Sequence, residues 1–324
     1  MYKIAKAKLD ELVTLISASQ DIYLADEINQ RPIKDVFFPQ SETLYTTKQA
    51  NRELTISPEA PKDKDFVIFG VKACMVRGIE ILDKVYLTEP VDSYYAARRA
   101  HSTIVARACG APEATCFCQA FAIDATNPAG DVVTWEIADE LFWKPITAKG
   151  ETLTTAVATL LTPADASAVA TYQQTIKEML KKLPYHDLKL DGWGGEALHE
   201  KFNSPLWETL HQACLACGTC TYLCPTCQCY DIKDYTAGCK VFRYRCWDSC
   251  MYSDFTLMAH GNNRTTQMQR FRQRFMHKLV YFPDNHDGVY GCVGCGECVK
   301  KCPAGLNIVK VIKAFKQQGS ENNE

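Results

Sequence analysis

The chain has 324 residues, which is enough for about two domains with hydrophobic cores. Hydrophobic residues make up 47% of it and charged residues 23%, a composition typical of globular proteins. The net charge of −2 excludes a global field that would favour nucleic acid or an anionic membrane surface, and no apolar run approaches the ~20 residues of a membrane span.

The N-terminal part of the chain alternates between predicted strands and helices. Residues 1–6 lead into an amphipathic stretch without the apolar core or cleavage site of a signal peptide, so we expect a cytoplasmic protein. The apolar runs 66–71 and 103–106 predict buried strands that lead into Cys74 and Cys109. Further predicted elements are helices over 77–87 and 94–100 and a strand over 132–137. Repeated β–α passes indicate an α/β domain.

The second half of the chain has a different character. Thr162 and Pro163 are expected to be the N-cap and first residue of a helix that runs to about residue 182. Residues 184–195 contain Gly and Asp and are interpreted as a linker. Beyond them the chain is cysteine-rich and basic. We therefore predict an α+β protein, with an α/β domain over 1–185 and a mainly α-helical domain over 186–324.

Cysteine is the outlier of the composition, with 17 residues. A cytosolic chain does not keep that many cysteines as disulfides, because its compartment is reducing. Clusters of cysteine at fixed spacing favour metal ligation instead. Oxygen-sensitive clusters in this number also suggest an anaerobic source.

Two cysteine runs match the bacterial ferredoxin pattern in full, including its proline. The runs are Cys214-x2-Cys217-x2-Cys220-x3-Cys224-Pro225 and Cys292-x2-Cys295-x2-Cys298-x3-Cys302-Pro303. In two-cluster ferredoxins the fourth cysteine of each run ligates the other cluster. We therefore expect two [4Fe–4S] clusters, the first held by Cys214, Cys217, Cys220 and Cys302 and the second by Cys292, Cys295, Cys298 and Cys224. Zinc is the alternative, but its ligands usually come as separated pairs.

A basic segment lies between the two runs. Residues 264–278 predict a helix with one apolar face and five Arg or Lys side chains. Positive charge beside an anionic cluster would raise its reduction potential. A solvated helix or a docking face is the other interpretation of the same pattern.

Another cysteine pattern has the spacing of the radical-SAM motif. It is Cys220-x3-Cys224-x2-Cys227, which overlaps a complete ferredoxin run. Nothing around it resembles the opening strand of a (β/α)-barrel, so radical chemistry is not favoured.

The N-terminal cysteines form a second constellation. Cys74 and Cys109 follow strands whose carboxyl ends would meet at one edge of a sheet, and Cys116-Phe117-Cys118 lies close by in sequence. Cys74, Cys109, Cys116 and Cys118 together predict a third [4Fe–4S] cluster, away from the ferredoxin pair; zinc and four buried free thiols are the alternatives. Five cysteines are left for a further metal site or for buried or redox-active thiols: Cys227, Cys229, Cys239, Cys246 and Cys250.

Motifs for independent catalysis are missing. The chain has no G-x-G-x-x-G, no P-loop and no H-E-x-x-H, and its seven histidines are scattered. His277 on the basic segment is interpreted as structural. We therefore identify no catalytic residues, and expect the electron donor and acceptor to lie on other subunits.

Several segments together resemble one protein family. They include Phe69-Gly70-Val71-Lys72-Ala73-Cys74, Cys116-Phe117-Cys118, Cys224-Pro225-Thr226-Cys227-Gln228-Cys229 and Cys292-Val293-Gly294-Cys295-Gly296. Over about residues 65 to 315, this pattern is similar to the 4Fe–4S dicluster subunits found in anaerobic sulfite reductase and, as the beta subunit, in NiFe sulfhydrogenase. The resemblance implies a partner subunit with FAD, NAD(P)H and a [2Fe–2S] cluster. It also implies a terminal subunit for sulfite reduction, hydrogen chemistry or disulfide reduction.

The expected function is therefore single-electron relay within an anaerobic, NAD(P)H-linked oxidoreductase. One alternative is a reductase whose substrate binds directly at the N-terminal cysteine site. Another is a non-redox binding protein in which clusters only brace the fold.

Overall fold

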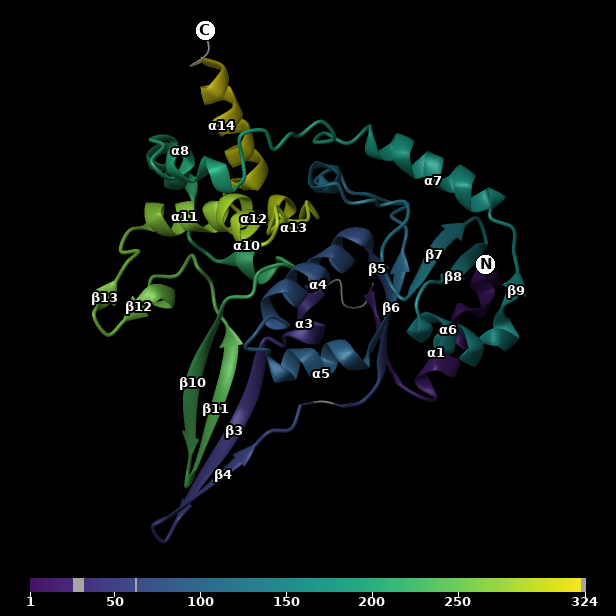
Figure 1. Ribbon diagram of the computed structural model, residues 1–324, viewed down its shortest axis with the longest axis horizontal. Coiled ribbons are helices and arrows are strands. Elements are labelled where there is room, and N and C mark those ends of the chain that lie inside the picture. The colour runs from purple at the N-terminus through teal and green to yellow at the C-terminus, as the bar shows by residue number, and fades with distance from the viewer. Residues whose placement is uncertain (26–31, 62, 322–324) are drawn as a thin grey trace. The chain divides into compact units, whose positions relative to one another are not determined.

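The computed structural model describes residues 1–25, 32–61 and 63–321 (Figure 1). It is a mixed α+β structure, 41% helical and 23% strand. Its contacts divide the chain into two compact units. Unit 1 comprises residues 1–33, 62–188 and 293–296, and unit 2 comprises residues 34–61, 189–292 and 297–324.

Unit 1 is built on a seven-stranded sheet in the order β2-β5-β6-β7-β8-β1-β9. The first four strands of this order are parallel, and the remaining pairs are antiparallel. The strands are β1 (Tyr2–Ala5), β2 (Asp21–Leu24), β5 (Phe66–Lys72), β6 (Ser102–Arg107), β7 (Val132–Ile137), β8 (Glu140–Pro145) and β9 (Thr162–Pro163). The strands predicted at 66–71, 103–106 and 132–137 are confirmed.

The helices of unit 1 connect and cover these strands. They are α1 (Leu9–Ser17), α4 (Ala73–Tyr86), α5 (Ser93–His101), α6 (Ala148–Ala156) and α7 (Ser167–Leu180), with 3-10 turns η1 (Lys6–Lys8), η2 (Cys118–Phe121) and η3 (Ala158–Leu160). The expected N-cap at Thr162 is wrong, because Thr162 and Pro163 pair with β1 and the helix begins at Ser167. The Asp83 carboxylate holds α5 against α4 by accepting from the Tyr95 hydroxyl (2.7 Å) and the Arg99 guanidinium (2.9 Å).

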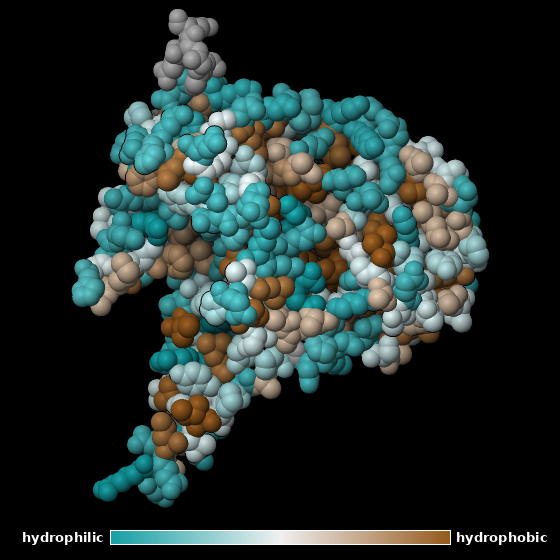
Figure 2. Space-filling model, viewed as in Figure 1, coloured by the Kyte–Doolittle hydropathy of each residue, from teal (hydrophilic) through white to brown (hydrophobic). Residues whose placement is uncertain are grey.

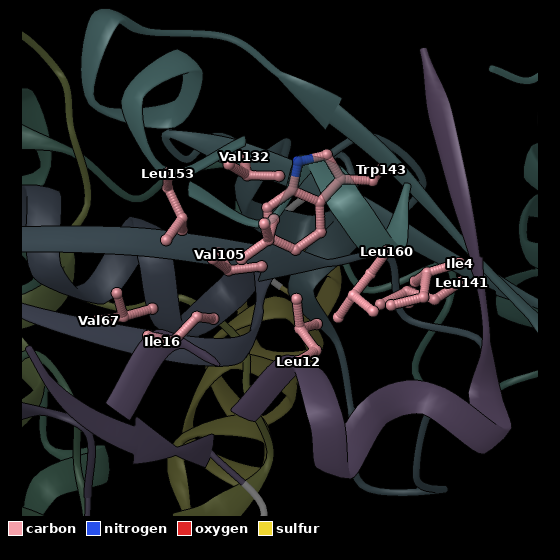
Figure 3. Packing of buried hydrophobic residues seen from close by; sticks show 11 residues of the cluster. Ile4, Leu12, Ile16, Val67, Val105, Val132, Leu141, Trp143, Leu153 and Leu160 are labelled. Atoms are coloured by element: carbon pink, nitrogen blue, oxygen red, sulfur yellow. The ribbon is translucent and has the colours of Figure 1, made fainter. Parts of the chain in front are cut away.

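One core of unit 1 gathers residues from most of these elements. Trp143 is fully buried at its centre, among Leu12 of α1, Val67 of β5, Val105 of β6 and Val132 of β7 (Figure 3). Burial on both faces explains why β5 is an almost continuous apolar run rather than an alternating one. This packing fixes the ends of β5 and β6, from which two of the predicted ligands extend.

Unit 2 contains the helices that follow residue 188 together with a short helix from earlier in the chain. These are α3 (Lys34–Phe37), α8 (Leu198–Phe202), α9 (Leu206–Leu210), α10 (Thr219–Tyr222), α11 (Gln267–Met276), η7, a π-helix (His277–Tyr281), α12 (Phe282–Asn285), α13 (Glu297–Lys300) and α14 (Ile308–Glu321), with 3-10 turns η4 (Gly195–Ala197), η5 (His211–Ala213) and η6 (Asp254–Thr256). Trp207 of α9 packs between Phe275 of α11 and Phe315 of α14, at ring-centroid distances of 6.3 and 4.9 Å. Helix α11 begins with a capping box between Thr266 and Gln269.

Unit 2 also contains a four-stranded antiparallel sheet, which the expectation of a mainly α-helical domain did not include. Its order is β10-β11-β3-β4, with β3 (Ser41–Ala50), β4 (Glu53–Pro58), β10 (Tyr230–Ala237) and β11 (Lys240–Trp247), and a separate pair is formed by β12 (Leu257–Met258) and β13 (Gly261–Asn262). Residues 34–61, which the sequence-based boundary placed in the first domain, therefore pack with the second. The buried Arg245–Glu42 ion pair joins β11 to β3 at 2.6 Å.

This sheet exposes apolar side chains to solvent. Leu54 and Ile56 of β4 and Ile232 and Tyr235 of β10 are all exposed, and Figure 2 shows hydrophobic residues over this part of the surface. None of the helices in the part of the chain that the structure describes has the length and hydropathy of a membrane span.

Candidate iron–sulfur sites

The first predicted ligand set converges on one pocket of unit 2. We call Cys214, Cys217, Cys220 and Cys302 the first cysteine site. All four line the same pocket, whose wall also includes Arg274 and Phe275 of α11. Gly218 starts helix α10 with φ +76°, and a Cβ there would lie 2.6 Å from the Tyr252 hydroxyl, so this turn requires glycine. The sequence thus brings four thiols from both ferredoxin runs to one pocket.

We call the second predicted ligand set, Cys224, Cys292, Cys295 and Cys298, the second cysteine site. Its members Cys224, Cys292 and Cys298 lie within unit 2. The Cys224 sulfur accepts a hydrogen bond from the Lys278 ammonium (3.3 Å) and lies 3.1 Å from the Thr226 hydroxyl. Cys298 is partly buried beside Cys224, Arg274 and Lys278, and desolvation raises the pKa of its thiol.

Two buried cations accompany these thiols. Burial alone would lower the pKa of Arg274, but the neighbouring Cys220 and Cys298 raise it above its usual value. Burial alone would likewise lower the pKa of Lys278, but the neighbouring Cys224, Cys227 and Cys292 raise it above its usual value. Among the described residues, the buried Nε of Arg274 has no hydrogen-bond partner. A net-anionic four-thiolate cluster fits this environment, because it would supply the negative charge that both cations face.

The Lys278 ammonium is fixed by three acceptors. Besides Cys224, it donates to the Thr226 hydroxyl (2.8 Å) and the Gly291 carbonyl (2.9 Å). Arg274 and Lys278 are thus buried at the cysteine sites and are not part of a solvated face, which favours the first interpretation of the basic segment. His277 packs its ring on Phe282, and burial lowers its pKa to about 4, in line with a structural role.

The N-terminal cysteines also lie together, within unit 1. Cys74 occupies the first turn of α4 directly after β5, and Cys109 follows β6. Cys118 is buried in the same cluster, with Cys74, Cys109 and Cys116 packed against it. We call these four residues the N-terminal cysteine site. The adjacent parallel strands β5 and β6 deliver two of the thiols, as their position at the carboxyl edge of the sheet predicted.

The electrostatics of the N-terminal cysteine site oppose free thiolates. Burial raises the pKa of Cys74, and the nearby Cys118, Cys109 and Cys116 raise it further, while Lys72 partly offsets them. Burial likewise raises the pKa of Cys118 to about 12. Backbone N–H groups of Ala111, Glu113 and Gln119 point at the sulfurs. Metal ligation needs thiolates, and N–H donors and a cation of this kind stabilise them once they are bound to a cluster.

The N-terminal cysteine site is in direct contact with the loop of the second ferredoxin run. The Phe117 N–H donates to the Gly294 carbonyl (2.8 Å), and the Cys116 thiol lies 3.7 Å from the Cys295 carbonyl. A Cβ on Gly294 or Gly296 would come within 2.5 Å of the backbone oxygen of Phe117 or Thr115. The expectation that this site lies away from the ferredoxin pair is therefore wrong, because two glycines allow the two ligand loops to touch.

The five remaining cysteines divide into three kinds. The thiol of Cys227 hydrogen-bonds to that of Cys224, and Cys229 and Cys250 hydrogen-bond to each other. Cys239 is exposed at the turn between β10 and β11, and Cys246 lies on β11.

Sequence analysis did not identify the buried Lys34 of unit 2. The Lys34 ammonium donates to the carbonyls of Thr221 (3.1 Å) and Cys227 (3.0 Å) and lies 4.1 Å from the centre of the Trp247 ring. No local signal could have found it, because Lys34 precedes its partner Thr221 by 187 residues.

Among the residues that the structure describes, no three His, Cys, Asp or Glu side chains converge as ligands of a single metal ion do. A [4Fe–4S] cluster binds one thiolate at each of four irons, so its ligands are spread around a larger centre.

Comparison with known proteins gives two matches. Residues 213–306 match the 4Fe-4S dicluster domain family. Over 288 residues, 88% of this chain and 83% of the relative, the sequence is 32% identical to sulfhydrogenase 2 subunit beta of Pyrococcus furiosus. No solved structure matches.

Proposed function

The chain belongs to the family of sulfhydrogenase 2 subunit beta and is an iron–sulfur electron-transfer subunit, and from this premise we propose its place in a larger enzyme. It relays single electrons between a catalytic partner and a [2Fe–2S] subunit that binds FAD and NAD(P)H. The catalytic partner is of the sulfite reductase, hydrogenase or disulfide reductase type. The complex works in the cytoplasm of an anaerobe.

The observation that carries the proposal is the first cysteine site. Four thiols from two distant runs line one pocket beside a buried arginine whose Nε has no partner among the described residues. This arrangement supports the interleaved assignment, in which Cys302 completes the first cluster and Cys224 the second. When bound, the clusters supply one-electron redox chemistry. The chain's own residues hold the sulfurs, line the pocket with the apolar rings of Phe271 and Phe275, and set the local charge through Arg274 and Lys278.

The N-terminal cysteine site supports a third [4Fe–4S] cluster. All four thiols lie together in unit 1 and each has a raised pKa, as expected for buried ligands without their metal. Four thiols complete the coordination of a cubane. A reductase that binds substrate directly at this site would need an open iron position, so four ligands favour electron relay over that alternative.

A redox titration of the anaerobically prepared full chain, followed by electron paramagnetic resonance, tests the proposal. We expect reduction of several distinct [4Fe–4S] signals within the range in which NAD(P)H-linked flavoproteins donate electrons. The isolated chain should not oxidise NADH, because it lacks nucleotide fingerprints, and activity should appear when the flavin subunit is added. Clusters that stay oxidised throughout the titration would leave only the structural role.

A further inference from the structure

Two cysteines without an assigned role lie together at the base of the β10–β11 hairpin. Cys229 directly precedes β10, and Cys250 follows β11 by three residues. The Asp248 N–H donates to the Cys229 carbonyl at 3.0 Å, which continues the ladder one step beyond the Tyr230–Trp247 pair. The register of the hairpin thus places Cys229 opposite Asp248, two residues before Cys250.

The turn that carries Cys250 is firmly held. Ser249 is fully buried, and its hydroxyl oxygen accepts from the Thr221 hydroxyl (2.7 Å) and from the Met251 N–H (3.2 Å). The Ser249 N–H in turn donates to the Asp248 carboxylate (2.6 Å). Cys250 therefore has a fixed position next to the end of β10.

The two side chains interact through their sulfurs. The thiols of Cys229 and Cys250 hydrogen-bond to each other, and the backbone N–H of Cys250 also donates to the Cys229 sulfur. The hydrogen bond from Cys250 lowers the pKa of Cys229 to about 7, and Lys278 and Lys34 act in the same direction. Cys229 is therefore the more readily ionised thiol of the pair, and Cys250 is its hydrogen-bond donor. Both residues are only partly buried.

Cys229 and Cys250 are distinct from the predicted cluster ligands. Their neighbour Cys227 pairs its thiol with Cys224 and its carbonyl with Lys34, and so belongs with the second cysteine site. Neither Cys229 nor Cys250 is part of a ferredoxin run. The pair therefore has no role in the three predicted clusters.

We propose that Cys229 and Cys250 form a redox-active dithiol that converts reversibly to a disulfide. The oxidant is a small disulfide, RSSR. The Cys229 thiolate attacks one of its sulfurs, and an RS⁻ leaves and takes up a proton to form RSH. Cys250, losing its proton, then attacks the Cys229 sulfur of the mixed disulfide and expels the second RS⁻. The balance is RSSR plus two Cys–SH giving two RSH plus one Cys–S–S–Cys, with two electrons passing to RSSR.

The dithiol differs in kind from the clusters. A cluster passes one electron at a time, whereas this pair stores and releases two together with protons. It would give an electron-transfer chain a two-electron site at the base of the hairpin. Formation of this disulfide requires neither the flavin subunit nor the catalytic subunit of the proposed complex.

The test treats the anaerobic, cluster-loaded full chain with bis(2-hydroxyethyl) disulfide, blocks free thiols and maps peptides by mass spectrometry. We expect a disulfide linking Cys229 to Cys250, loss of these two thiols from alkylation, unchanged iron content, and full reversal by dithiothreitol. Because this peptide map is made on the wild-type chain, its result does not depend on whether a substituted chain folds.

Matched variants sharpen the result. C229S and C250S should each abolish the disulfide, whereas C239S, which removes the exposed thiol at the hairpin turn, should leave it intact. The proposal is overturned if both thiols remain alkylatable in excess oxidant, or if Cys229 pairs with another cysteine. Loss of iron in C229S or C250S would overturn it as well, because the pair would then be cluster ligands.

Discussion

At the scale of single residues, the charge beside the clusters is supplied by buried cations rather than by surface ones. Lys278 is the clearest case, because its ammonium contacts a predicted ligand sulfur at 3.3 Å and two further acceptors. A cation in hydrogen-bond contact with a ligand stabilises the more negative, reduced cluster. The identity of this residue should therefore set a reduction potential and not merely support the fold.

We predict that Lys278→Met lowers the midpoint potential of one C-terminal cluster. A hydrogen bond to a charged group contributes about 1.5–3 kcal/mol. With ~59 mV for 1.4 kcal/mol in a one-electron couple, the decrease should be roughly 60–130 mV. A spectroscopic redox titration measures it, with the iron content as a check of cluster loading. Lys310→Met, at an exposed position on α14, is the control, and equal potentials in both fully loaded variants would count against this role of Lys278.

At the scale of elements, sequence patterns predicted the strands and cysteine motifs that depend on residues close together in the chain. The first site was predicted from the spacing of two ferredoxin runs that exchange their fourth cysteine. The N-terminal site was predicted from two strand ends that lead into cysteines. The strand at 66–71 was recognisable because both of its faces are buried. The hairpin of β10 and β11 was missed because most residues of β10 are exposed and polar. Strand β11 of this hairpin also pairs with β3, about two hundred residues earlier in the chain, and a local sequence pattern cannot predict such a pairing.

The contact between two ligand loops in unit 1 also escaped sequence analysis, although its glycines are part of the motif. Gly294 has φ +59°, and an added Cβ would lie 2.5 Å from the Phe117 carbonyl oxygen. Gly288 has a similar φ of +78°, but nothing lies within 4 Å of its Cβ position. A substitution at either position strains the backbone, but only a substitution at Gly294 also disturbs the close approach of the two loops.

We predict that Gly294→Ala destabilises the chain more than Gly288→Ala does. The left-handed conformation costs each variant roughly 1–2 kcal/mol. Only Gly294→Ala must also displace the Phe117 backbone and weaken its hydrogen bond to residue 294. Denaturant unfolding followed by circular dichroism gives the free energies, and alkylation of Cys116 reports on the loop contact. Equal losses in the two variants, with Cys116 equally protected, would show that this contact contributes nothing.

At the scale of the whole molecule, the division into units decides which experiments are sound. Residues 34–61 pack with unit 2, where the Phe38 carbonyl accepts from the Trp247 indole (2.9 Å) and Lys34 binds the carbonyl of Cys227. A fragment over 186–324 would lose both contacts and the strands β3 and β4. The number of clusters is therefore best counted on the full chain, with substitutions in place of truncation.

The last prediction concerns that count. The full chain should bind about twelve irons, as three [4Fe–4S] clusters. The double variant Cys116→Ser, Cys118→Ser should lose about four of them and keep the other eight, because a cubane that loses half its thiolates is not retained while the two ferredoxin runs are intact. Iron and sulfide assays after anaerobic purification provide the numbers. Cys239→Ser, which removes an exposed thiol outside all three sites, should leave the iron content unchanged. Full iron in the double variant would instead mean that the four N-terminal cysteines are buried free thiols, whose raised pKa reflects packing alone.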